Sequence, residues 1–364
     1  MITLEQKVIT ALSTVQDPDL KKDLVSLKMI DGLEVSDGVI SFNLKLTTPA
    51  CPLKEMIKRD CIAAIHKYLG SEWDVQVQFA SQVTSSRIKE NLLPKVKNII
   101  AIASGKGGVG KSTIAVNIAI SLAKYGAQVG LLDADIYGPS IPIMLGCENQ
   151  KTSVEKIGDR NFIIPLKKHG IKFLSIGFFT QNSKDAIVWR GPMASKALCQ
   201  LITDALWGDL DYFIVDLPPG TSDIHLSLVQ LVPVTGVVIV TTPQKISIED
   251  AIKGLEMFKK KQINVPILGL IENMAYFTPI NLPQQKYYIF GNGGGVKLAQ
   301  QYCIPFLGSI PIIQSICDGA DLGIPDTLND GIAMNIFNDL SMALAQQIAI
   351  RNVAIAPTEI VNKN

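Results

Sequence analysis

The sequence lacks the cysteine spacings that mark zinc sites, thioredoxin-type redox motifs and disulfide frameworks. No two of its cysteines are separated by only two residues. These classes of site are therefore excluded, and each thiol is expected to behave as a small buried hydrophobic group. The six cysteines are Cys51, Cys61, Cys147, Cys199, Cys303 and Cys317.

An excess of charge of either sign is also missing. Thirty-four basic residues face thirty-three acidic ones, without a block of Lys and Arg, which argues against nucleic acid or an anionic membrane as a partner. No apolar run approaches the eighteen residues of a membrane-spanning helix, and the first residues, MITLEQKVIT, form no apolar signal region. The sequence predicts a cytoplasmic protein that does not enter a membrane.

The length and the apolar content indicate two domains with extensive buried surface. A chain of 364 residues exceeds the usual size of a single core. Apolar residues make up 47% of the chain and charged residues only 18%, which favours a helix-covered sheet or a dimer interface.

Residues 1–80 are predicted to form a small α/β domain. A helix over about residues 3–15 precedes LEVSDGVISFNLKL, whose two alternating runs meet at Asp37-Gly38 as in a β-hairpin. A second helix begins near Pro52 and is expected to bury Ile57, Cys61, Ala64 and Tyr68. WDVQVQF then alternates like a further strand, and the polar residues 81–97 are predicted to be a linker.

Residues 98–364 change to short apolar runs separated by helical stretches, beginning with NIIAIAS, QVGLLDAD and DYFIVDLPPG. GVVIVTTPQ, PILGLIENM and IPFLGSIPI continue the series. Continuous apolar strands are buried on both faces, and their alternation with helices predicts a doubly wound, mostly parallel α/β sheet. Ligands of such sheets bind at the carboxyl ends of the strands.

The stretch ASGKGGVGKST at residues 103–113 satisfies the P-loop pattern between a predicted strand and a predicted helix. The backbone N–H groups of such a loop cradle phosphates, Lys111 neutralises phosphate oxygens, and the Ser112 hydroxyl binds Mg²⁺. Asp216 closes the strand YFIVD, where a P-loop enzyme places a magnesium-facing carboxylate. The predicted nucleotide-binding residues are Gly105, Lys106, Gly107, Gly108, Val109, Gly110, Lys111, Ser112 and Thr113.

The same loop also fits the dinucleotide pattern G-x-G-x-x-G, with Asp133 near the position of a ribose-binding carboxylate. A dinucleotide loop has no use for Lys-Ser after its third glycine, so a nucleoside triphosphate is favoured over NAD. An NAD(P) oxidoreductase would be protected against thermal unfolding by nicotinamide cofactor and not by ATP.

The second lysine of the loop, Lys106, resembles that of the deviant P-loop in the nitrogenase iron protein, the arsenite pump ATPase and the MinD/ParA ATPases. The resemblance implies a homodimer in which Lys106 reaches the nucleotide of the other subunit. A cation supplied in this way is worth about 10³ to 10⁵ in the rate of phosphoryl transfer.

Within that superfamily the chain resembles the Mrp/ApbC group of iron–sulfur cluster carrier ATPases. The blocks LLDADIYGPSIPIMLG, VWRGPM, DYFIVDLPPGTSDIHLSL, IENMAYF and IFGNGGG occur in the order of that group, and DPDL and TTPACPL resemble the small domain of iron–sulfur assembly proteins. The resemblance implies an ATP- and Mg²⁺-dependent hydrolase that binds iron–sulfur clusters and transfers them to apoproteins.

The resemblance also assigns roles. Asp135 matches the switch I carboxylate that orients or deprotonates the attacking water, and Asp216 begins switch II. Asp133 either supports Asp135 or caps a helix. Asn273 matches the residue that reads the adenine edge, and Arg190 either faces an anion or is structural.

One departure from the family concerns the cargo. After ENMAYF the family carries Cys-x-x-Cys, which with its dimer mate supplies four thiolates to a [4Fe–4S] cluster, whereas this chain has TPINLPQQKYYIFG. Without these thiolates the usual cluster site is absent. A cluster-free nucleotide-switched adaptor of the MinD/ParA type is therefore a second hypothesis.

Cys51 is the remaining candidate for contact with iron. It precedes Pro52, so it is predicted to be the N-cap of a helix whose first residue is Pro52. The N–H groups and dipole there favour the reactive thiolate. Cys51 also matches the cysteine of the assembly domain's TxxxCP block; an inert cap-position thiol is the alternative.

Overall fold

The computed structural model of the chain describes residues 3–87, 92–179, 191–279 and 281–361. The chain divides into two compact units. The first comprises Met1–Thr84 and Ala349–Ile355, and the second comprises Ser85–Ile348 and Ala356–Asn364.

The first unit contains a three-stranded sheet covered by two helices. Strand β4 lies in the middle of the sheet, antiparallel to β3 and parallel to β5. The predicted hairpin is confirmed, because Asp37 and Gly38 both have the positive φ of a tight two-residue turn, 47° and 81°. The elements are α1 (Leu4–Leu12), β1 (Gln16–Asp17), β2 (Lys22–Asp23), β3 (Ile30–Ser36), β4 (Val39–Leu46), α2 (Lys54–Leu69) and β5 (Asp74–Ser81).

Helix α2 differs from the prediction in its start and in its buried face. It begins at Lys54 with Leu53 as its N-cap, so neither Cys51 nor Pro52 has the predicted helix position. The residues that pack against the sheet are Ile57, Cys61 and Ile65, at spacings of four, while Tyr68 is 50% exposed. The helix therefore turns Tyr68 away from the core.

The second unit is built around an eight-stranded sheet in the order β10-β11-β7-β12-β6-β13-β14-β15. Only the short edge strand β10 runs antiparallel to its neighbour, so the predicted mostly parallel sheet is confirmed. The strands of this sheet are β6 (Val96–Ser104), β7 (Val129–Asp133), β10 (Leu166–Lys168), β11 (Ile171–Ser175), β12 (Leu210–Asp216), β13 (Gly236–Thr241), β14 (Ile267–Phe277) and β15 (Phe306–Ile312). A separate two-stranded sheet is formed by β8 (Ser153–Ile157) and β9 (Arg160–Ile164).

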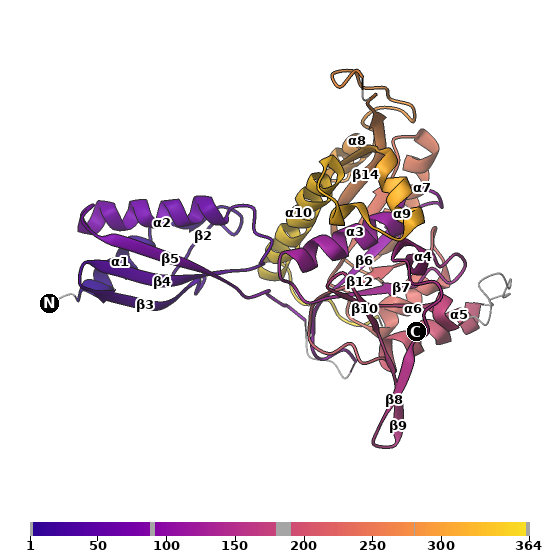
Figure 1. Cartoon of the computed structure of the whole chain (residues 1–364), viewed down its shortest axis with the longest axis horizontal. Helices are drawn as coiled ribbons and strands as arrows, with labels where there is room; N and C mark the ends of the chain where they lie inside the picture. Colours follow the sequence, from indigo (N-terminus) through magenta and orange to yellow (C-terminus); the bar gives the residue numbers. More distant parts are fainter. Residues whose placement is uncertain (1–2, 88–91, 180–190, 280, 362–364) are drawn as a thin grey trace. The chain divides into compact units, whose positions relative to one another are not determined.

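Helices cover both faces of this sheet, as expected for a doubly wound fold (Figure 1). The main core cluster lies between the sheet and α5, α6, α7 and α8, whereas α3 packs against β6, β7 and β12 from the other face. The helices are α3 (Lys111–Lys124), α4 (Ile141–Met144), α5 (Gly191–Thr203), α6 (Asp223–Leu231), α7 (Lys245–Lys259), α8 (Gly294–Gln301), α9 (Gln314–Leu322) and α10 (Ile332–Ala354), with 3₁₀ turns η1 (Ile176–Phe179) and η2 (Asp326–Leu328).

The parallel register brings polar residues to one edge of the sheet. Ser104, Asp133 and Asp216 each end one of three adjacent strands, and Asp216 lies directly beside Asp133 in the β12–β7 pair. Because the carboxyl ends of parallel strands meet at a common edge, this is where a ligand site is expected.

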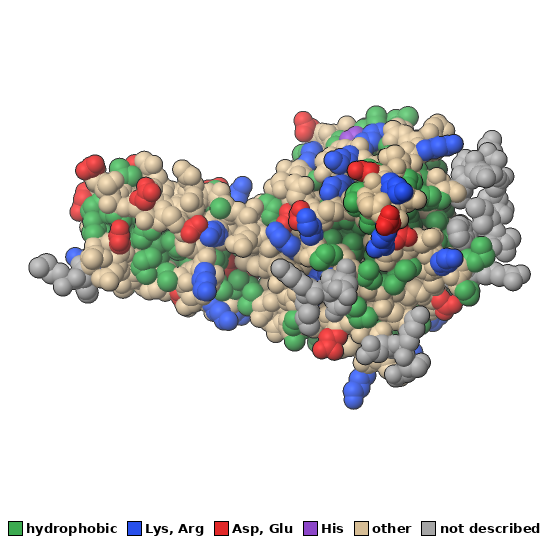
Figure 2. Space-filling view, turned by 90° about the horizontal axis from the view of Figure 1, so that it is seen from below, with side chains coloured by type: hydrophobic (Ala, Val, Ile, Leu, Met, Phe, Trp, Pro, Cys, Tyr) green, Lys and Arg blue, Asp and Glu red, His purple; other side chains and the backbone are tan. Residues whose placement is uncertain are grey.

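The described surface shows no strong segregation of charge on the face drawn in Figure 2, where acidic and basic side chains lie interspersed. Among the helices of the described ranges, none is both long and apolar enough to cross a membrane.

Candidate functional site

The P-loop, residues 105–110, connects β6 to α3, and its glycines are required by its geometry. Gly108 and Gly110 have φ values of 79° and 83°, in the left-handed region that favours glycine. A Cβ atom on Gly105 would lie 2.2 Å from the carbonyl carbon of Asp250 in α7. The loop borders a cavity of about 190 Å³ that Asp135 and Pro219 also line.

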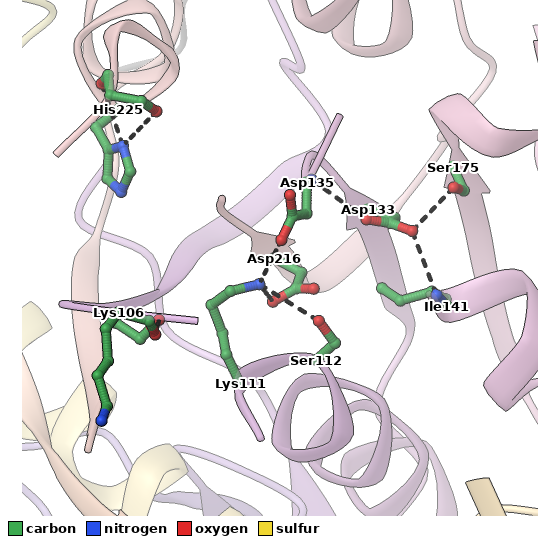
Figure 3. Close-up of polar contacts among 11 residues, drawn as sticks. Lys106, Lys111, Ser112, Asp133, Asp135, Ile141, Ser175, Asp216 and His225 are labelled. Atoms are coloured by element: carbon green, nitrogen blue, oxygen red, sulfur yellow. Dashed lines mark hydrogen bonds and ion pairs between the residues drawn. The ribbon is translucent and has the colours of Figure 1, made fainter. Parts of the chain in front are cut away.

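Lys111 is the charged centre of the site. Its Nζ donates to Asp216 Oδ1 at 2.7 Å and to the Ser112 hydroxyl at 3.3 Å, and it lies 3.7 Å from Asp135 Oδ2 (Figure 3). Lys111 is 6% exposed and Asp216 is fully buried. The structure thus brings together four residues that the sequence assigned to one site from three separate segments.

Asp216 has the features of a cation ligand. Its Oδ1 accepts from Lys111, but its buried Oδ2 has no hydrogen-bond partner among the described residues. A buried carboxylate oxygen without a partner is costly, and a cation removes that cost. Asp216 and the neighbouring Ser112 hydroxyl are oxygen donors of the kind that Mg²⁺ prefers, so the residues present fit this ion.

Asp133 holds the segment that carries Asp135. Its Oδ1 accepts from the Asp135 N–H at 3.2 Å, and its Oδ2 accepts from the Ile141 N–H at the start of α4 at 3.3 Å. The Ser175 hydroxyl donates to the same Oδ2 at 2.9 Å. Asp133 therefore combines both predicted alternatives, support of Asp135 and a bond to a helix start. Ser175 has no signal in the sequence, since it reaches the site only through the pairing of β11 with β7.

Burial raises the pKa of the carboxyl groups of Asp133 and Asp135. Burial, and next the charge of Asp216, raise the pKa of Asp133 to about 8. Burial also raises the pKa of Asp135, against the lowering effect of Lys111. Two carboxyl groups, those of Asp135 and Asp216, face one buried ammonium group, with Asp133 beside them, so the site is poised to accept further positive charge.

Lys106 lies apart from this cluster. Its side chain is directed away from Lys111, as Figure 3 shows, and its Nζ donates to Gln244 Oε1, the N-cap residue of α7, at 3.2 Å. Lys106 is half-buried, and in the described structure the ion-pair partner of Asp135 and Asp216 is Lys111 rather than Lys106. The ammonium group of Lys106 therefore lies at α7 and does not join the Lys111 cluster of its own chain.

Asn273, the predicted adenine reader, lies at the P-loop. Its Nδ2 donates to the Val109 carbonyl at 2.8 Å, so strand β14 is tied to the loop through this amide. A Cβ on Gly110 would lie 2.2 Å from the same Nδ2, which is a second reason for glycine there. Arg190 lies outside the described residues.

His225 is a buried histidine in the first turn of α6. Its Nδ1 lies 3.2 Å from the Ser222 hydroxyl, and its Nε2 has no partner among the described residues. Burial lowers the pKa of His225 to about 4, and the charge of Lys111 adds to the effect. The ring is therefore neutral near neutral pH, as a structural histidine is.

His225 should make the fold sensitive to acid. Between pH 6.5 and about 4 the unfolded chain binds a proton at His225 that the folded chain does not, so stability falls as the pH falls through this window. The loss reaches about 3 kcal/mol at 1.36 kcal/mol per pKa unit. Urea unfolding at several pH values should show a smaller loss for His225→Gln, and His66→Gln is the control. An identical pH dependence of the unfolding free energy in His225→Gln and the parent would contradict a role of His225 in this acid sensitivity.

Cys51 lies in the first unit and does not have the predicted environment. Burial is the largest effect and raises the pKa of its thiol, and the nearby charges of Asp17 and Asp19 act in the same direction. The expectation of a helix-stabilised thiolate is therefore wrong, because Cys51 precedes the N-cap Leu53 and is half-buried. All six cysteines are free, and the described part of the chain holds no group of three or more His, Cys, Asp or Glu residues that could hold a metal ion.

Comparison with known proteins agrees with this geometry. The model of the ParA family, described as NUBPL iron-transfer P-loop NTPase, matches residues 95–349, and that of an iron-sulfur cluster assembly protein matches residues 5–79. A nucleotide-binding protein from Archaeoglobus fulgidus, solved in complex with ADP, is 37% identical with a TM-score of 0.56, covering 65% of this chain and 90% of that one.

Two curated relatives cover nearly the whole chain. The iron-sulfur cluster carrier protein of Synechocystis sp. is 48% identical over 87% of this chain and 90% of its own length. The iron-sulfur cluster carrier protein of Deinococcus radiodurans is 44% identical over 98% of this chain and 99% of its own length. The resemblance inferred from the sequence is thereby confirmed, and a nucleoside triphosphate site is favoured over the dinucleotide alternative. The chain belongs to the family of NUBPL-type iron-transfer P-loop NTPases of the ParA group.

Proposed function

We propose that this protein is a cytoplasmic ATPase that binds iron–sulfur clusters and transfers them to apoprotein clients, working as a homodimer. The observation that carries the ATPase part is the convergence of Lys111, Ser112, Asp135 and Asp216 at the P-loop cavity. The cargo follows from the names of the relatives, which are iron–sulfur cluster carrier proteins. The nearly balanced charge of the chain supports a protein partner over nucleic acid or a membrane surface.

In the proposed reaction, the phosphate oxygens of ATP compete with Asp216 and Asp135 for the ammonium group of Lys111. The N–H groups of the P-loop bind the phosphates. Ser112 and Asp216 would hold Mg²⁺, which would supply positive charge to neutralise the phosphates. Asp135 orients the attacking water and accepts its proton, and burial supports this role by raising its pKa. Asp133 positions Asp135 through the Asp135 N–H.

Lys106 completes the site from a second chain. Its direction away from Lys111 and its contact with Gln244 support this role, because a lysine that served its own nucleotide would face the Lys111 cluster. Asn273 is placed on β14 within reach of the loop and is proposed to contact the adenine edge, which favours ATP over GTP.

Asp216→Asn should weaken the dependence on magnesium. Loss of one negative charge at the metal site is expected to raise the Mg²⁺ concentration for half-maximal hydrolysis by at least about tenfold, or about 1.4 kcal/mol. Asp211→Asn, in the same strand and paired with Lys97 at 2.8 Å, is the matched control. A magnesium titration of Asp216→Asn that matches the parent would remove Asp216 from the metal site.

The cluster is a cargo for which the chain offers few ligands. The stretch 278–290 contains no cysteine, and Cys51 is the thiol that matches the assembly-domain block. We propose that Cys51 contacts iron, with the missing ligands supplied by a dimer mate or a client. Because burial raises the pKa of the Cys51 thiol, iron must displace its proton, so loading should improve with rising pH.

Anaerobic reconstitution with iron and sulfide tests the cargo. The parent and Cys51→Ser are loaded side by side, with and without an apo-client, and iron, sulfide and the absorption spectrum are measured. Cys51→Ser is expected to lose most of the iron, and Cys303→Ser, which removes an exposed thiol, is expected to keep it. Equal iron in the parent and Cys51→Ser, or none in either, would overturn the proposal that Cys51 contacts iron.

A second candidate function is a cluster-free nucleotide-switched adaptor. It is favoured by the lack, within the described ranges, of any group of three His, Cys, Asp or Glu residues suited to a metal ion. Parent protein that hydrolyses ATP but binds no iron even with an apo-client would support the adaptor.

A further inference from the structure

A groove of about 800 Å³ lies between α6 and α7, on the second unit and away from the P-loop cavity. Its walls are Leu226 and Gln230 of α6, Met257 of α7 and Ile263 beyond it. Val361 of the C-terminal segment forms part of its lining. Four of its ten lining residues are apolar, and the other six are polar or charged, so the groove offers both apolar contacts and hydrogen-bonding groups.

The C-terminal segment, described to residue 361, forms part of the wall of this groove through Val361. The segment has neither helix nor strand structure, and the Val361 N–H donates to the Val229 carbonyl in the last turn of α6 at 3.0 Å. That carbonyl lacks its usual helical donor because the residue four positions on is Pro233, which has no N–H. The segment therefore supplies a hydrogen bond that α6 cannot make by itself.

The side chain of Val361 adds an apolar contact, since it packs against the main core cluster. The charges are also complementary. The groove is lined by two lysines, Lys253 and Lys260, and one acidic residue, Glu256, while the described segment carries a single charge, that of Glu359. One backbone hydrogen bond and one half-buried side chain form a contact that can open without unfolding the unit.

The groove adjoins the proposed switch II. Thr221 lines the groove and directly follows residues 216–220, the segment that begins with Asp216. This segment is tied to the P-loop strand β6, because the Gly220 N–H donates to the Ser104 carbonyl at 2.8 Å. Helix α6 begins two residues later, at Asp223. The contact of the C-terminal segment with α6 therefore lies on the element that directly follows the residues carrying Asp216, and any coupling between the two sites would act in both directions.

We propose that the C-terminal segment is a releasable peptide ligand of α6, held at the Val229 carbonyl beside this groove, and that nucleotide at the P-loop controls release of this segment. The coupling rests on the proposed nucleotide binding, whereas binding of the segment does not. The two parts are therefore measured separately.

The first measurement uses a variant that ends at Ile355 and a fluorescein-labelled peptide, Ala-Pro-Thr-Glu-Ile-Val-Asn-Lys-Asn, of residues 356–364. Fluorescence anisotropy without nucleotide should show saturable binding to the shortened chain and at least about tenfold weaker binding to the full chain, because the chain's own Val361 already holds the Val229 carbonyl there. The peptide with Val361→Asp should bind at least about tenfold more weakly, since a carboxylate would enter the apolar core.

Leu226→Glu in the shortened chain should abolish peptide binding, and Ile246→Glu, at a position on α7 that is 66% exposed, should leave it intact. Thermal unfolding of each variant confirms that it is folded. No binding to a folded shortened chain, equal binding to the full chain, or binding unaffected by Leu226→Glu would overturn the site. Loss of self-association on shortening would show that the segment seats on a second copy, which contradicts the intramolecular contact.

The second measurement repeats the titration with Mg²⁺ and ATP. The peptide affinity of the shortened chain should change by at least about fivefold, the low end of typical coupling between sites. Lys111→Ala should remove this change. An affinity that does not respond to nucleotide, in a chain shown to bind ATP, would overturn the coupling.

Discussion

Lys111→Ala is expected to weaken ATP binding by at least about 100-fold, which corresponds to about 2.7 kcal/mol. Lys111 is the one buried cation held by Asp216 at 2.7 Å and by Asp135 at 3.7 Å within the described site. Its removal leaves these carboxyl groups uncompensated, and they then repel the triphosphate. Isothermal titration with ATP and Mg²⁺ measures the change.

The same substitution breaks a buried ion pair, so it should also lower the stability of the chain by a few kcal/mol. Thermal unfolding must therefore show that the variant is folded at the temperature of the titration. Lys124→Ala, which removes the last lysine of α3 far from the carboxylates, is the matched control for binding. Unchanged ATP affinity in folded Lys111→Ala would contradict the placement of the phosphates at this lysine.

Lys106→Ala should leave ATP affinity within about threefold of the parent and lower kcat by about 10³, the low end of the effect of a cation supplied in trans. The reason for the split is that such a cation acts mainly on charge that develops in the transition state. Steady-state hydrolysis and a binding titration on the same samples separate the two effects.

Gln244→Ala is the matched control for Lys106, because it removes the partner of the 3.2 Å contact and leaves the lysine in place. If the loss in Lys106→Ala came only from that contact, Gln244→Ala would reproduce it. Hydrolysis by Lys106→Ala at the parental rate would remove Lys106 from the reaction.

The fold could be predicted where burial leaves a pattern in the sequence. All six predicted strands of the sheet are present, since a strand buried on both faces is a continuous apolar run. β10 and β11 were missed because their sequences are short and carry lysines that bond main-chain carbonyls, as Lys168 and Lys172 do. The β8–β9 hairpin was also missed, although Gly158-Asp159 between two short runs is a turn signal.

The site could be predicted only where a motif carries it. The P-loop could be located from local spacing alone. The hydrogen bonds of Asp133 with Ser175 and Ile141 could not be predicted, because they depend on the order of the strands. Cys51 shows the opposite error. Its local sequence favoured a reactive thiolate, and tertiary burial beside Asp17 and Asp19 raises its pKa instead.

Mixing two inactive variants tests most directly whether one hydrolysis site needs two chains. In a mixed dimer of Lys106→Ala and Lys111→Ala, the first chain keeps Lys111 and receives Lys106 from the second, so one complete site forms. Each variant alone is expected to be nearly inactive, and an equimolar mixture is expected to recover up to about a quarter of the parental rate, since half the dimers are mixed and each carries one complete site. A mixture no more active than its components would contradict the account.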